Sequence, residues 1–268
     1  MTNLRPYILD NAATAEYQRL DLMSKILDPC TLDPWTRGHL RALGLGPGWR
    51  CLELGSGNGS VAEWLCAEVG PAGSVTAVDV NPVLVDLIPA QNLTVRRMDI
   101  RTEDLEENSY DLVTCRAVLH QIAEHAPAVL AKLAAAVKPG GWLFVQEPDF
   151  HLAPTTEPEA WGETWRELIA WGHANGVDWL IGRSLPGMVS RLRLGRPEAK
   201  TDVQNIRGRD RGALYFQLFF AEVRDRVLES GRLDASTFDR ASALLDDPDY
   251  WTQCWMMTAV WMRKSRPA

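Results

Sequence analysis

The sequence predicts an α/β fold, a doubly wound and mostly parallel sheet with helices on both faces. Three observations support this prediction. Short apolar runs alternate with helical patterns from about residue 46 to residue 150. These runs are almost continuously apolar, as strands buried on both faces require. A glycine-rich turn follows the first run, and acidic residues follow several of the others.

The glycine-rich turn is the run ELGSGNG at residues 53–59, placed between an apolar stretch and a helical pattern over residues 60–69. Glycines let the backbone approach a ligand closely, because no Cβ is in the way. The helix that follows presents free N–H groups to the same place. The turn therefore predicts a site for a nucleotide-containing cofactor.

The spacing of the glycines separates two kinds of cofactor. Dinucleotide sites use the pattern G-x-G-x-x-G, whose third glycine lies within the helix. Gly55 and Gly57 match the first two positions, but Ser60 takes the sixth, and Gly59 comes one place early. A nicotinamide-dependent oxidoreductase is therefore the weaker alternative.

Acidic residues end the next two strands. Asp79 closes a strand over residues 74–79, about 20 residues after the turn, where a carboxylate can accept hydrogen bonds from both ribose hydroxyls. Asp99 follows a third strand over residues 93–98. In an open α/β sheet, ligands bind outside the carboxyl ends of the strands, so these acids converge on one rim.

The remaining elements complete the sheet. A fourth strand covers residues 110–115, and the segment after it leads into a helix that reaches residue 137. A turn at residues 138–141 precedes a fifth strand that ends at Glu147. Residues 196–206 predict a sixth strand, and residues 251–262 an antiparallel seventh. Residues 1–45 are interpreted as an N-terminal helical extension.

Two helical inserts, residues 155–195 and 208–248, are expected to form a lid within a single domain of residues 1–268. Their helical patterns cover residues 157–174, 185–194, 212–228 and 236–245. Aromatic residues concentrate there, and a flat apolar acceptor suits such a surface. The more favoured interpretation of most of these rings is the lid's own core or a contact with a partner subunit. The aromatic residues in question are Trp161, Trp165, Trp171, Trp179, Tyr215, Phe216, Phe219 and Phe220.

Taken together, these segments resemble a class I S-adenosylmethionine-dependent methyltransferase. The resemblance rests on the motifs at residues 53–59, 78–79, 98–100, 110–113 and 133–141, in the family's order and spacing, and covers about residues 45–150. It implies a Rossmann-like sheet of seven strands with an antiparallel last strand. Residues 61–65, 69–73 and 247–248 are similar to bacterial enzymes that methylate small molecules in natural-product metabolism.

The resemblance implies roles for residues that contact S-adenosylmethionine. Glu53 orients the amino group, Asp79 accepts from the ribose hydroxyls, and Asp99 accepts from the adenine amino group. The other expected contacts are Gly55, Ser56 and Gly57 along the methionine part, Val80 and Asn81 beside the adenine, Ile100 on the ring, Arg116 and Ala117 near the methionine end, and Tyr17 and Arg19 covering it from the N-terminal helix. Asp99 has a structural alternative as a helix cap, and Arg116 as the partner of a strand-end carboxylate.

Methyl transfer from a sulfonium mainly requires alignment of the nucleophile and exclusion of water. A base is needed where the nucleophile must lose a proton early, as a phenol or alcohol does. His120 and His151 are the candidates near the rim, with Glu147 as an orienting carboxylate, because histidine is suited to proton transfer near neutral pH. For each histidine the alternative is an ordinary packed or exposed side chain.

Composition narrows the partners. The net charge of −7 argues against a nucleic-acid substrate, and no apolar run reaches the length of a membrane span. No signal segment precedes the fold, so a cytoplasmic location is expected. The five cysteines show no metal-ligand spacing, and Cys51 and Cys115 are expected in the core.

The expected function is methyl transfer to oxygen or nitrogen of a small molecule, a secondary metabolite. One alternative is a protein that binds the cofactor without transferring methyl, as a binding module or a cyclase-like catalyst.

Overall fold

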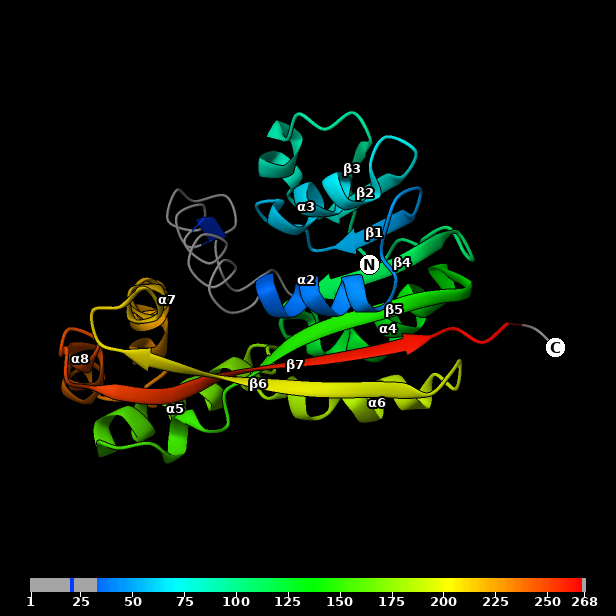
Figure 1. The fold of residues 1–268 in the computed structure, drawn as a ribbon. Coiled ribbons are helices and arrows are strands. Elements are labelled where there is room, and N and C mark those ends of the chain that lie inside the picture. Colours follow the sequence, from blue (N-terminus) through cyan, green and yellow to red (C-terminus); the bar gives the residue numbers. More distant parts are fainter. Residues whose placement is uncertain (1–19, 22–32, 267–268) are drawn as a thin grey trace.

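The computed structural model describes residues 20–21 and 33–266. Within this part of the chain, seven strands form one sheet in the order β3-β2-β1-β4-β5-β7-β6 (Figure 1). The strands are β1 (Arg50–Leu54), β2 (Ser74–Asp79), β3 (Leu93–Arg97), β4 (Tyr110–Arg116), β5 (Val137–Asp149), β6 (Pro197–Arg207) and β7 (Trp251–Arg263).

The first five strands are parallel to one another, and β7 runs antiparallel to both β5 and β6. This topology confirms the predicted α/β sheet with an antiparallel last strand. The helical elements are α2 (Asp33–Ala42), α3 (Ser60–Val69), η2 (Pro82–Leu87), η3 (Leu119–His125), α4 (Ala126–Ala136), η4 (Ala153–Thr155), α5 (Glu159–Ala174), η5 (Ile181–Arg183), α6 (Leu185–Arg191), α7 (Arg211–Glu229) and α8 (Ala235–Leu244).

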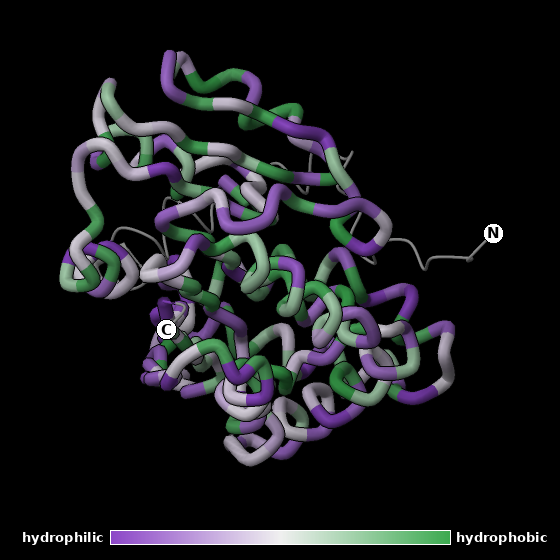
Figure 2. The backbone as a smooth tube through the Cα atoms, turned by 90° about the vertical axis from the view of Figure 1, so that its right-hand side faces the viewer, coloured by the Kyte–Doolittle hydropathy of each residue, from purple (hydrophilic) through white to green (hydrophobic). Residues whose placement is uncertain are grey.

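Both faces of the sheet are covered, because successive side chains of a strand point to opposite faces. Cys51 and Phe144 pack in the cluster that contains α2 and α3. Their neighbours Leu52 and Val145 pack in the cluster that contains α4 and α6. Figure 2 shows hydrophobic and hydrophilic residues interspersed along the whole backbone. The cysteines at 51 and 115 are fully buried, as predicted.

The lid helices α5, α7 and α8 gather at one end of the long β6–β7 pair (Figure 1). Their aromatic rings pack on one another, with the Phe150 and Trp165 rings 4.9 Å apart and the Trp161 and Phe220 rings 5.6 Å apart. All eight aromatic residues singled out in the lid are buried. This confirms that they form the core of the lid, while Leu214 on α7 stays 44% exposed.

The first lid insert divides between two places. α5 packs in the aromatic cluster, but η5 and α6 lie against the sheet, where Leu185 and Val189 join the cluster beneath β4 and β5. Among the described residues, no helix is both long enough and apolar enough to cross a membrane.

Three predicted features differ from the structure. The helix predicted after β4 is split into η3 and α4, because Ile122 has a non-helical backbone (φ −129°, ψ 43°) and Pro127 lies at the start of α4. The fifth strand was predicted to end at Glu147, but β5 continues to Asp149 and Glu147 is fully buried. The predicted turn at residues 138–141 is an irregularity within β5, since the pairing with β4 shifts there.

Candidate active site

Two glycines of the turn after β1 are required by the fold itself. Gly55 (φ +71°) and Gly59 (φ +85°) have left-handed backbones that favour glycine. A Cβ built on Gly55 would overlap Val118, and one on Gly59 would overlap Ile88. Gly59 is also the residue from which α3 starts. These two positions are therefore explained without a ligand.

Gly57 is different, because space remains beside it. Its φ is +54°, and the nearest atom to a Cβ built there is Leu20 Cδ2 at 3.8 Å. The hydroxyl of the adjacent Ser56 is buried and has no hydrogen-bond partner among the described residues. An open backbone beside a buried unpaired hydroxyl fits a bound polar group, as a cofactor cradle requires.

Asp79 ties the turn to the end of β2. Its Oδ2 accepts from the Gly57 N–H at 2.9 Å, and its Oδ1 accepts from the Asn81 N–H at 2.9 Å. Each carboxylate oxygen has a second lone pair, so Asp79 can still accept ribose hydroxyls. Val80 beside it is 45% exposed. The structure thus brings the turn and three of the predicted cofactor residues together.

Glu53 and Arg116 lie at the ends of the two central strands. Glu53 is buried within β1, where it pairs with Ala77 and Thr114. One Arg116 guanidinium nitrogen lies 3.4 Å from Ser60 Oγ at the start of α3. Ala117 has a φ of +55°, which is unusual for a residue other than glycine and turns the chain sharply where β4 ends.

Asp99 lies beside Asp79 on the rim, since the Met98 N–H donates to the Asp79 carbonyl at 2.9 Å. Both Asp99 carboxylate oxygens accept from Arg101, at 2.8 Å and 3.0 Å. This hydrogen bonding lowers the pKa of the Asp99 carboxyl. Ile100 is buried in the core cluster beneath the rim. The role of Asp99 and Ile100 at the adenine remains a prediction.

His120 and Glu147 form a buried pair. His120 Nδ1 lies 2.9 Å from Glu147 Oε2, and the same carboxylate accepts from the backbone N–H groups of Val118, Leu119 and His120. An ionised carboxylate only accepts, so His120 Nδ1 is the donor of this contact, and in a neutral ring Nε2 is then the bare nitrogen. The Gln121 amide donates to that nitrogen at 2.6 Å. The predicted orienting role of Glu147 thus has a geometric basis.

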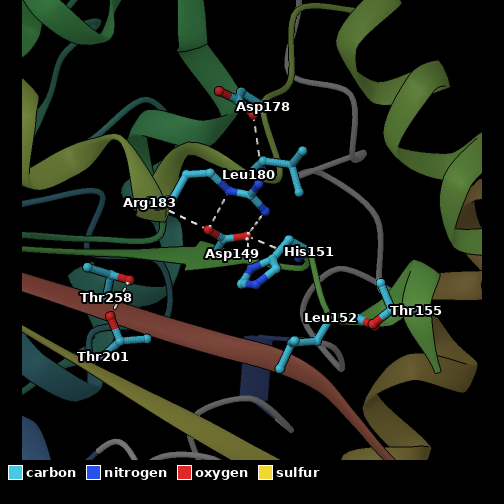
Figure 3. Close-up of polar contacts among 9 residues, drawn as sticks. All are labelled: Asp149, His151, Leu152, Thr155, Asp178, Leu180, Arg183, Thr201 and Thr258. Carbon is cyan, nitrogen blue, oxygen red and sulfur yellow. Dashed lines mark hydrogen bonds and ion pairs between the residues drawn. The ribbon is translucent and has the colours of Figure 1, made fainter.

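His151 belongs to a second, more exposed pair (Figure 3). Its Nδ1 lies 3.1 Å from Asp149 Oδ1, and its side chain is 40% exposed. Arg183 also holds Asp149, with Nε at 2.9 Å and Nη2 at 2.8 Å. Burial raises the pKa of the Asp149 carboxyl, while Arg183 acts in the opposite direction. This cluster joins β5 to η5, and its Asp149 carboxylate already forms an ion pair with Arg183.

Tyr17 and Arg19 lie outside the described residues. Conversely, the sequence reasoning did not single out Gln146 or its neighbour Thr36. The Thr36 hydroxyl donates to Gln146 Oε1 at 3.0 Å. A signal was available, because Gln146 is an amide within the otherwise apolar run of β5.

The fold and this rim define a Rossmann-like, cofactor-binding α/β protein of the methyltransferase type. A family model described as a methyltransferase domain matches residues 30–185, which is more than half of the chain. The chain therefore belongs to the methyltransferase-domain family. The resemblance found in the sequence is confirmed, and S-adenosylmethionine is the cofactor that goes with it.

Curated relatives resemble part of the chain. It is 28% identical over 137 residues to the ubiquinone/menaquinone biosynthesis C-methyltransferase UbiE of Ectopseudomonas mendocina, covering 48% of this chain and 53% of the relative. It is 30% identical over 149 residues to the methyltransferase str2 of Strobilurus tenacellus, covering 54% and 50%. The chain thus spans about half the length of these relatives.

A solved structure shares the fold. Phosphoethanolamine N-methyltransferase 2 of Haemonchus contortus, in complex with S-adenosylmethionine, superimposes with a TM-score of 0.61 at 15% identity. The match covers 97% of this chain and 60% of that one. At this identity the likeness concerns the fold alone.

Proposed function

We propose that this protein transfers a methyl group from S-adenosylmethionine to an oxygen or nitrogen atom of a small-molecule acceptor, a secondary metabolite. The observation that carries this proposal is the carboxyl-end rim. There the turn around Gly57, the Asp79 carboxylate and the buried His120–Glu147 pair lie on adjoining strands. The net charge of −7 supports a small molecule over a nucleic acid.

The cofactor supplies an activated methyl group on a positively charged sulfur. In this chain, Gly57 and Ser56 would hold its methionine part, and Asp79 its ribose. Glu53 is placed for the amino group because it is buried on β1, beside the turn. These residues bind and orient; none of them needs to exchange a proton.

His120 would act as the base for the acceptor. Glu147 fixes the ring with its proton on Nδ1, which leaves Nε2 to take a proton from an acceptor hydroxyl or amine. Gln121 now donates to Nε2, so its side chain would have to give way when the acceptor binds. His151 is the weaker candidate, because Arg183 already neutralises the carboxylate behind it.

Methyl-labelled S-adenosylmethionine and a bacterial metabolite extract would test the proposal, with product structures determined by NMR. A label on oxygen or nitrogen of a small molecule is expected. A label on carbon would contradict the O- or N-directed reaction. Binding of S-adenosylhomocysteine without any transfer would instead favour a protein that binds the cofactor without methylating.

A further inference from the structure

One buried amide has a hydrogen-bond donor that the site described so far does not use. Gln146 is fully buried on β5, and its Oε1 accepts from the Thr36 hydroxyl at 3.0 Å. Its Nε2 is also buried, but it has no hydrogen-bond partner in the described part of the chain. Leaving a buried N–H donor unpaired costs free energy, so native proteins rarely do so without a reason.

The position of Gln146 on the sheet indicates where this donor is needed. Strand pairing places Gln146 between Arg116 on β4 and Ala259 on β7. Phe144, two residues earlier, faces α2 and α3, so Gln146 faces the same side, as its contact with Thr36 of α2 confirms. Gln146 therefore lies one strand beyond Arg116, on the side of the rim away from the Asp79 turn.

The chemistry of this row favours an oxygen atom. The Gln146 Nε2 group and the Arg116 guanidinium can only donate hydrogen bonds. Ala259, the next residue in the row, has a small buried side chain that brings no polar group. A ligand atom at this place must therefore accept, as carbonyl, carboxylate and phenolate oxygens do.

We propose that Gln146 anchors the methyl acceptor through a hydrogen bond from Nε2 to an acceptor oxygen, with Thr36 as the positioning residue that orients the amide. The inference rests on the proposed methyl transfer. It adds a substrate class, small molecules that carry a carbonyl, carboxylate or phenolate oxygen apart from the atom that is methylated. It also separates the acceptor subsite on β5 from the cofactor residues on β1 and β2.

Four variants of the full chain isolate this role. Gln146→Leu keeps the volume and removes the donor. It removes one unpaired buried group but leaves the Thr36 hydroxyl without its acceptor, so the two effects on thermal stability oppose one another and melts of the variant accompany the binding measurements. Gln204→Leu is the matched control, because Gln204 is a buried glutamine on β6 whose amide donates to Asp202. Thr36→Val removes the orienting hydroxyl, and Thr36→Ser should restore it.

The probes are 4-hydroxybenzoate and 4-aminobenzoate, each compared with its analogue that has a methyl group in place of the carboxylate. The side-chain amide signals of Gln146, assigned by their loss in Gln146→Leu, would be followed by NMR in protein saturated with S-adenosylhomocysteine. Both probes that carry a carboxylate should change the chemical shifts of the Gln146 side-chain amide, and their methyl analogues should not. Affinity for the carboxylates should fall roughly tenfold or more in Gln146→Leu and in Thr36→Val, but not in Gln204→Leu or Thr36→Ser.

Calorimetry with S-adenosylhomocysteine distinguishes the outcomes. Unchanged affinity for it in Gln146→Leu supports an acceptor role, whereas an equal loss assigns the amide to the cofactor and overturns the inference. Amide signals that neither carboxylate moves also overturn it. Because this readout is binding, it is independent of turnover: carboxylate binding through Gln146 without any labelled product would refute the proposed function alone.

Discussion

The glycines of the turn after β1 are alike in sequence but differ in what surrounds them. A side chain at position 55 or 59 would collide with Val118 or Ile88, whereas a Cβ at position 57 would meet only Leu20, at an ordinary contact distance of 3.8 Å. The Ser56 hydroxyl beside this position is buried and unpaired among the described residues. At the residue scale, the ligand-facing part of the motif is therefore narrow, consisting of Ser56 and Gly57.

Replacing Gly57 with alanine should lower S-adenosylhomocysteine affinity by roughly tenfold or more, because the new methyl group occupies the cradle. The left-handed backbone adds a stability cost of about 1–2 kcal/mol. Gly48→Ala is the matched control: its φ is +85° and nothing lies within 4 Å. Calorimetry and thermal melts should show the same stability loss in both variants but lost affinity only in Gly57→Ala. If Gly57→Ala and Gly48→Ala bind S-adenosylhomocysteine with equal affinity, Gly57 does not belong to the cofactor site.

We expect replacement of the two histidines to affect turnover very differently. His120→Ala should lower kcat by about 10²–10⁴-fold for an acceptor that must lose a proton, since a positioned base contributes that much. His151→Ala should change it little. His173→Ala, an exposed position on α5, serves as the control. Steady-state kinetics with the labelled cofactor would measure this, and equal losses at positions 120 and 151 would disprove the assignment of the base.

At the scale of elements, the end of β5 is held to its neighbours by two buried carboxylates of the same strand face. Glu147 accepts the backbone N–H groups that begin η3. Asp149 accepts the backbone N–H and the side chain of Arg183 at the end of η5. Each carboxylate therefore fixes a short helical turn against the strand, and each also carries a histidine.

Replacing Arg183 with leucine should destabilise the protein at neutral pH and less so in acid. Burial already raises the pKa of Asp149, and removing Arg183 removes the groups that lower it. A raised folded-state pKa means that the ionised form carries the cost. The cost is therefore full above the folded pKa and disappears as pH falls through it toward the unfolded value.

Thermal melts of Arg183→Leu between pH 4 and 8 would measure this dependence (a range chosen around the ordinary carboxyl pKa of about 4). Arg191→Leu on α6 is the control, since Arg191 is exposed and makes no side-chain hydrogen bond or ion pair with the rest of the described chain. The gap in Tm between the two variants should narrow as pH falls. A gap that stays constant or widens in acid would show that Asp149 is not the group responsible.

At the scale of the whole molecule, β7 belongs to the sheet and to the lid at once. Its second half pairs with β5 from Trp142 to Asp149, while its first half reaches Trp255 in the aromatic cluster. β6 accompanies it along nearly its whole length. The lid is thus not attached by a flexible connection.

We expect lid and sheet to unfold together. Near-ultraviolet circular dichroism reports the tertiary packing of aromatic residues in both the lid and the sheet clusters, and far-ultraviolet circular dichroism reports the secondary structure of the whole fold. The two melting curves should coincide, and S-adenosylhomocysteine at about 100 times its Kd should stabilise both by about 2.7 kcal/mol. Separate transitions, with only one shifted by the ligand, would contradict a single cooperative unit.

Sequence patterns predicted the sheet well, because its strands are buried on both faces and end in acids or turns. The ranges predicted for β2 and α3 match the structure, that for β6 is shifted by one residue, and that for β7 ends one residue early. The break in the helix after β4 was missed, since nothing in the local pattern before Pro127 marks Ile122 as non-helical. The extension of β5 was missed because Pro148 signals a strand end, yet β7 pairs beyond it.

The site was harder to predict, because its contacts are made between distant segments. The convergence of Glu53, Asp79 and Arg116 follows from strand ends and needs no structure. Thr36 and Gln146 are 110 residues apart in the sequence, and no local pattern predicts their contact. The Asp99–Arg101 pair could not be predicted from the sequence either, since an arginine two residues after an acid implies no particular geometry.

The position of α7 and α8 has a consequence for how such proteins diversify. Both helices lie between β6 and β7, at the tip of what would otherwise be a hairpin, and the two strands stay paired below it, with one irregularity between Gln204 and Ile206. The entropy cost of a longer tip grows only slowly with its length. A different helical tip can therefore replace this one while the strands and the cofactor rim stay unchanged.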